Sequence, residues 1–127
     1  MSEFNFKSAI CTSREQSERL LALGLKKETA DMCHRTNGMG IYFVTAINPL
    51  HNPCDIPAWS LHRLLSLLPT EIPCEYENSL GMFLGEENSV FYFGAGDYYT
   101  HANLYDATIS CIEGVIREGY FNKEYLI

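Results

Sequence analysis

The chain is short of positive charge. It carries 9 lysines and arginines against 16 aspartates and glutamates, a formal net charge of −7 at pH 7. A protein that binds nucleic acid needs a basic surface for the phosphates, and nine scattered cations do not supply one, so we expect no nucleic-acid partner. The acidic residues are scattered too, and only Glu86 and Glu87 are adjacent. An acidic decoy that imitates nucleic acid would need the fold to gather carboxylates on one face.

Long apolar runs and closely spaced cysteines are also missing. The most apolar stretch, residues 41–47, is far shorter than the roughly 20 residues of a membrane helix. Residues 1–7 lack the basic and then apolar layout of a signal peptide. The five cysteines are odd in number and far apart, so we expect them to be reduced and mostly buried. These features predict a cytoplasmic protein with no membrane partner.

What is present is the composition of one globular domain, 1–127, with 46% hydrophobic and 20% charged residues. The chain is organised around residues 55–69, which hold the only tryptophan, Trp59, and the densest leucine cluster. Those leucines follow the spacing of a helix that buries one face. Pro57 suits the first helical position and Pro69 ends the run. The pattern predicts a central core helix with Trp59 in its first turn.

Two further helices are predicted from their ends. Thr12 and Glu15 match a capping box that begins a helix over 13–23, and the following glycine suits a helix stop. Asn103 caps a second helix over 104–118. Gly114 in its interior costs about 1 kcal/mol relative to alanine, which indicates close packing against a neighbouring element.

Strand patterns occur at residues 40–47, 74–78, 80–84 and 89–93. The intervening turn makes the last two an antiparallel hairpin, and residues 40–47, apolar on both parities, predict a strand covered on both faces. The predicted fold class is α+β: a single domain with three main helices packed on an antiparallel sheet of three to four strands.

The polar and aromatic loop at residues 94–101 is the first candidate for chemistry. Asp97 and His101 could form an acid/base pair there, which would make the chain a small ligand-binding protein or enzyme. The alternative is that both side chains only form hydrogen bonds with the polar groups of the loop. The Gly-x-Gly at its start lacks the third glycine of a dinucleotide site, so no cofactor is predicted.

Metal and thiol chemistry are weaker hypotheses. His51 and Cys54 are the one closely spaced pair of metal ligands in a loop context, and without a second pair we predict no metal site. Cys11 precedes a predicted helix start, where a thiol pKa can fall, and it is the best of the candidate nucleophiles. A structural thiol is the favoured interpretation.

Aromatic residues are plentiful, with eight tyrosines, seven phenylalanines and one tryptophan. They could cover both faces of a thin sheet, or some could form a protein interface, where large and partly polar rings are favoured. Trp59, Tyr98 and Tyr99 are the candidates for such an interface. The leading hypothesis is a non-enzymatic interaction or accessory protein whose partner is a second copy or another protein.

Three patches of the chain resemble a group of short, uncharacterised bacterial and prophage-type proteins. Thr12–Met32, which begins Thr12-Ser13-Arg14-Glu15, is similar to their opening, Ile56–Pro69 to their middle and Ile116–Tyr120 to their close. The resemblance implies an accessory protein of a mobile element. It assigns no catalytic residue, because the matching positions are caps, core leucines and helix ends.

Overall fold

The computed structural model describes residues 9–36, 39, 42–46, 55–73, 79–92 and 98–127. These residues form an α+β fold, as predicted. In chain order its elements are α1 (Arg14–Ala22), the 3-10 helix η1 (Lys27–Thr29), β1 (Met32–Thr36), β2 (Tyr42–Ala46), β3 (Ile56–Ala58), α2 (Leu61–Leu67), β4 (Leu80–Phe83), β5 (Asn88–Tyr92), β6 (Tyr98–His101), α3 (Leu104–Arg117) and η2 (Lys123–Tyr125).

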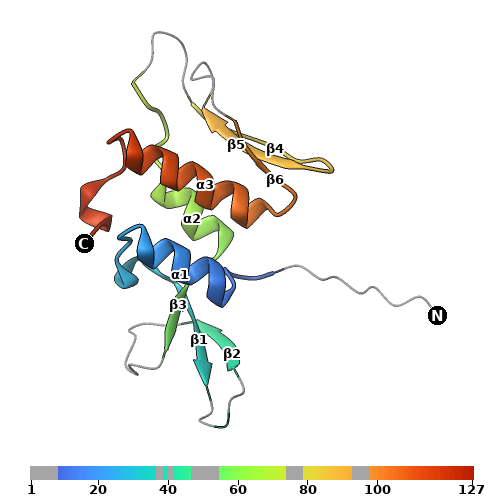
Figure 1. The fold of residues 1–127 in the computed structure, drawn as a ribbon, viewed down its shortest axis with the longest axis vertical. Helices are drawn as coiled ribbons and strands as arrows, with labels where there is room; N and C mark the ends of the chain where they lie inside the picture. The colour runs from blue at the N-terminus through green and yellow to red at the C-terminus, as the bar shows by residue number, and fades with distance from the viewer. Residues whose placement is uncertain (1–8, 37–38, 40–41, 47–54, 74–78, 93–97) are drawn as a thin grey trace, which may run out of the picture.

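The described strands form two sheets, where the sequence predicted one sheet of three to four strands. Each has three antiparallel strands, in the orders β2-β1-β3 and β4-β5-β6. The two sheets lie at opposite ends of the fold with the three helices between them (Figure 1). Helix α3 packs on β5 and β6, α2 packs on α3, and α1 contacts both α3 and β3. The helices therefore form a middle layer, and the sheet β4-β5-β6 packs one of its two sides on α3.

Helix α1 begins one residue later than predicted. Ser13 is the N-cap: its hydroxyl accepts from the Gln16 N–H at 3.1 Å, and the Gln16 side chain accepts from the Ser13 N–H at 2.9 Å. The predicted stop is confirmed. Gly24 has φ +96°, and the Leu25 N–H donates to the Leu20 carbonyl at 3.2 Å, which closes a Schellman motif.

The central helix is shorter than its leucine pattern suggested. Pro57 lies in strand β3 and not at a helix start, and the N-cap is Ser60, one residue after Trp59. Because β3 is at the edge of its sheet, the missing N–H of Pro57 costs the sheet little. Pro69 ends the helix as predicted, with Leu68 held in an extended conformation at ψ 142°.

Helix α3 confirms its predicted cap and its predicted close contact. The Asn103 side chain accepts from the Tyr105 N–H at 2.8 Å, and Gly119 ends the helix with φ +81°. A methyl group on Gly114 would lie 2.6 Å from Cζ of Tyr99. The glycine therefore lets the backbone of α3 approach the aromatic ring on β6.

The hairpin of β4 and β5 is antiparallel, as predicted. Strand β2 is not covered on both faces, because Phe43 is 47% exposed. Three strands were missed. Strands β1 and β6 have mixed polar sequences, and β3 was assigned to the start of the central helix. The predicted strand at 74–78 lies outside the described residues.

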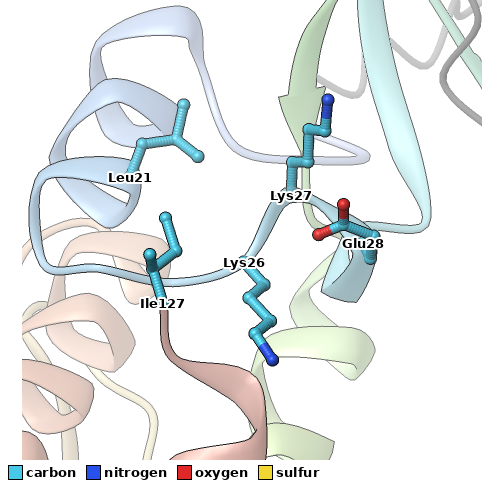
Figure 2. Close-up of a pocket in the computed structure, with 5 residues that line it drawn as sticks. All are labelled: Leu21, Lys26, Lys27, Glu28 and Ile127. Atoms are coloured by element: carbon cyan, nitrogen blue, oxygen red, sulfur yellow. The ribbon is translucent and has the colours of Figure 1, made fainter.

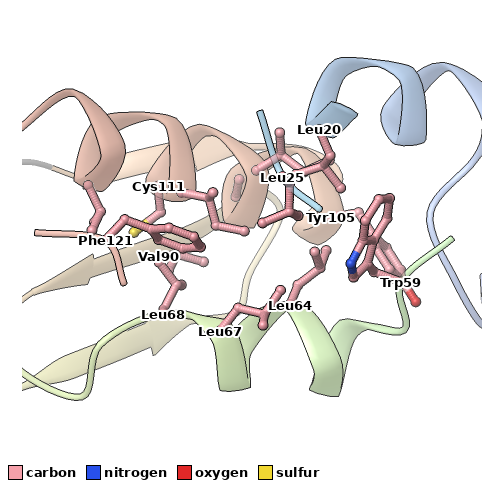
Figure 3. Packing of buried hydrophobic residues seen from close by; sticks show 14 of the residues in the cluster. Leu20, Leu25, Trp59, Leu64, Leu67, Leu68, Val90, Tyr105, Cys111 and Phe121 are labelled. Atoms are coloured by element: carbon pink, nitrogen blue, oxygen red, sulfur yellow. The ribbon is translucent and has the colours of Figure 1, made fainter. Parts of the chain in front are cut away.

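The hydrophobic core fills the space between the helices and the inner side of β5 (Figure 3). Trp59, Leu64 and Leu20 are fully buried in it, together with Val90 from β5 and Ile109 from α3. Each such aliphatic side chain contributes about 1.5–3 kcal/mol when it leaves water. No helix in the described ranges has the length and apolar character needed to cross a membrane.

Candidate functional site

Trp59 is part of the core and not of a surface. Its exposed fraction is 0%, and its indole N–H donates to Thr29 Oγ1 at 2.9 Å. Its backbone N–H donates to Thr12 Oγ1 at 3.1 Å, and the Thr12 N–H donates to the Trp59 carbonyl at 2.9 Å. This burial removes Trp59 from the candidate interface.

The polar groups around Trp59 hold chain segments together. Asp31 accepts from both the N–H and the hydroxyl of Ser60, at 2.8 and 2.6 Å. His34 Nε2 lies 2.7 Å from the Thr12 carbonyl, and the Thr12 and Ser17 hydroxyls lie 2.8 Å apart. All but the Thr12–Ser17 contact join a cap or a backbone group to a neighbouring segment. The cluster therefore joins the segment before α1 to β1, and Ser60 at the start of α2 to Asp31.

The described cysteines are not activated. Cys11, Cys33 and Cys111 are free and buried, as predicted, whereas Cys54 and Cys74 lie outside the described residues. Burial raises the pKa of the Cys11 thiol, and the negative charge of Asp31 raises it further. A nucleophilic cysteine needs the opposite shift.

His101 lies on strand β6 and is exposed, while its proposed partner Asp97 lies outside the described residues. His101 Nε2 is 2.9 Å from Ser110 Oγ on α3. Ser110 Oγ also accepts from Arg19 of α1 at 3.3 Å, and Arg19 pairs with Glu113 at 3.0 Å. The group ties β6, α3 and α1 together at the surface. His101 and Ser110 line neither of the two cavities described next.

The larger of these two cavities is an open hollow of about 610 Å³, lined by Leu21, Lys26, Lys27, Glu28 and Ile127. Leu21 and Ile127 lie close together, and the two lysine side chains point in opposite directions (Figure 2). The two cations therefore do not converge on one anion. The smaller cavity, about 30 Å³ beside Tyr99 and Gly114, has room for little more than a water molecule.

The described residues also offer no metal site: no three His, Cys, Asp or Glu side chains among them gather to hold an ion. The predicted pair His51 and Cys54 lies outside the described ranges.

The strongest surface feature is the outer side of the sheet β4-β5-β6. The register pairs Phe91 with Gly81 and Tyr98, and it pairs Ser89 with Phe83 and Thr100. Side chains alternate along a strand, so these six residues share one side. The opposite side carries Val90, which is fully buried, and faces α3. We call the six residues the outer face.

Two contacts confirm that the outer-face side chains are neighbours. The rings of Phe91 and Tyr98 lie 4.9 Å apart with a 41° interplanar angle, and the Ser89 and Thr100 hydroxyls are 2.7 Å apart. Phe83 is 63% exposed and Tyr98 is 67% exposed. Large rings therefore stand in solvent in a sheet whose inner side already packs on a helix.

The outer face carries no charge. Strands β4, β5 and β6 contain no aspartate, glutamate, lysine or arginine, in a chain with 25 such residues. The acidic pair Glu86 and Glu87 lies in the turn at the rim. An uncharged patch of aromatic rings bordered by charge is typical of a protein interaction site.

Of the predicted interface residues, only Tyr98 belongs to the outer face. Its neighbour Tyr99 points to the opposite side, against Gly114 of α3. Phe83 and Phe91 were missed because their position beside Tyr98 depends on strand β6, which the sequence analysis placed in a loop. The β-prone run Tyr98-Tyr99-Thr100 was the available signal.

Comparison with models of protein families, with curated proteins and with solved structures finds no match to this chain. The resemblance to prophage-type proteins therefore stays a prediction from the sequence, and function has to be argued from the geometry.

Proposed function

We propose that this chain is a non-enzymatic intracellular interaction protein whose docking surface is the outer face. One observation carries the proposal: Phe83, Phe91 and Tyr98 form an uncharged aromatic side of a sheet that needs no further cover to fold. A three-stranded sheet packed on a helix is stable with one side in water. With the prophage-type resemblance, the proposal extends to an accessory protein of a mobile element.

The first test asks whether the outer face serves folding. Tyr98→Ser should change the free energy of unfolding by less than about 1 kcal/mol, because Tyr98 is mostly exposed. Tyr99→Ser is the matched control on the same strand, and it should cost roughly 3 kcal/mol because Tyr99 packs on α3. Equal losses in the two variants would mean that the outer face is structural.

The second test asks whether the outer face binds protein. A photoreactive phenylalanine analogue at position 98 should give crosslinked adducts of discrete mass in the native host. The control is the same analogue at Phe43, a half-exposed aromatic on the other sheet. Adducts absent at position 98, or equally abundant at position 43, would contradict the proposal.

A further inference from the structure

We propose that the occupant of the outer face is a second copy of this chain, packed face to face about a two-fold axis that runs along β5. The inference rests on the proposed function and adds the identity of the partner. Two features of the face support it, the order of large and small residues and the absence of charge, and the size of the face sets the expected affinity.

The order of residues makes the face complementary to itself. Across the sheet, one row is Gly81, Phe91 and Tyr98, and the next is Phe83, Ser89 and Thr100. A two-fold axis along β5 sets each row opposite the same row of the second copy and exchanges β4 with β6.

Each large residue on the edge strands β4 and β6 then meets a small one. Phe83 faces Thr100 of the second copy, and Tyr98 faces Gly81 of the second copy. Ser89 and Phe91 lie on the axis and face their own equivalents, so that the two Phe91 rings form an aromatic pair. Contacts of this kind are isologous, and they close as a dimer.

Charge favours this side of the molecule for self-association. Two copies of net charge −7 repel each other, and an uncharged face lets them meet without burying carboxylates. Raising NaCl from about 0.05 to about 0.5 M shortens the Debye length from roughly 14 Å to roughly 4 Å, so salt should strengthen the dimer. A basic protein partner would show the opposite dependence.

The size of the face sets the expected affinity. Its three rings, of which Phe83 and Tyr98 are mostly exposed, offer on the order of 300–400 Å² per copy. A standard stable interface takes about 800 Å² from each partner. We therefore expect a weak dimer, with a dissociation constant of roughly 10–100 µM.

A size-swap experiment tests the pairing by sedimentation equilibrium on the full chain at up to about 500 µM. Thr100→Phe places two large rings opposite each other and should raise the dissociation constant about tenfold. Phe83→Thr removes a ring and should also raise it about tenfold. The double variant restores one large and one small residue at each contact, and its dissociation constant should return to within about threefold of the parent's.

Phe43→Ser, on the other sheet, is the control and should leave the dissociation constant unchanged. Circular dichroism melting of every variant checks that it is folded. We expect the variants to fold, because Phe83 and Thr100 are both exposed.

A 14.4 kDa monomer at every concentration and salt level would overturn the second-copy assignment. So would a double variant that is no tighter than its single parents, or a dimer that salt weakens. Crosslinks from position 98 to a different protein, in a chain that stays monomeric, would leave the proposed function standing while this inference fails. A chain that stays monomeric and gives no crosslinks from position 98 would overturn both this inference and the proposed function.

Discussion

Gly114 offers the sharpest test of the packing between α3 and β6. Replacing it with alanine should raise helix stability by about 1 kcal/mol if propensity alone decided. In the fold, however, the new Cβ would lie 2.6 Å from Cζ and 2.9 Å from Cε1 of Tyr99, where ordinary contact begins at 3.4 Å. The ring is packed against the hydrophobic core, so it has little room to turn away. Overpacking of this kind costs about 1–3 kcal/mol, which leaves a net loss of about 0–2 kcal/mol for Gly114→Ala once the gain in helix propensity is subtracted.

The assay is urea unfolding followed by the fluorescence of Trp59, which is the only tryptophan and is fully buried. A loss of 1 kcal/mol corresponds to a fall in Tm of about 4 °C for a chain of this size. Tyr99→Ala is the partner substitution, and the double variant should show a coupling of about 1 kcal/mol or more. A Gly114→Ala variant that is more stable than the parent, or a cycle with no coupling, would refute the close approach.

Three further predictions use the same unfolding assay. Thr12→Val leaves the backbone N–H of Trp59 without its acceptor and should cost about 1–3 kcal/mol; an unchanged midpoint would contradict that hydrogen bond. Gly119→Ala forces a side chain into φ +81° and should cost about 1 kcal/mol, whereas a gain would show that the helix end is not held there. Burial raises the pKa of Cys111 to about 12 from an ordinary 9.0, so the stability that this thiol contributes is intact below pH 9 and is lost as the pH rises toward 12. Cys111→Ala should show a shallower loss over that pH window, and equal slopes would contradict the shifted pKa.

Helix ends were predictable because their chemistry is local. Gly24, Gly119, Asn103 and Pro69 act through the conformation and hydrogen bonds of a few adjacent residues, and all four stand where the sequence placed them. The cap of α1 shifted by one residue because Thr12 and Ser13 are both good caps. The buried backbone of Trp59 needed an acceptor, and Thr12 supplied it, which left Ser13 to cap the helix.

The predicted start of the central helix was wrong because tertiary contacts, and not local sequence, decide the conformation of Pro57. Pro57 fits a first helical turn, but it fits an edge strand equally well. Pairing with β1 decides between them: Pro57 lies opposite Cys33, and Ala58 lies opposite Met32. Strand β1 is itself half polar, so no local signal in the sequence showed that a partner strand was there.

The outer face could not be predicted from the sequence for a related reason. Tyr98 and Tyr99 are adjacent, and only the register of β6 sends one to solvent and the other to α3. A shift of one residue would exchange them. Phe83 and Phe91 join Tyr98 only after three strands are paired, so a candidate interface built from single residues could find one member of it.

The acidic composition has a second physical meaning in this fold. An exposed aromatic sheet face makes a protein prone to indiscriminate association, and the face carries no charge of its own to prevent it. The net charge of −7 is carried elsewhere in the chain, and it repels copies that approach in other orientations. If the outer face is the docking surface, this repulsion restricts contact to partners that match it. A variant with fewer acidic residues away from this face should then aggregate before it loses stability.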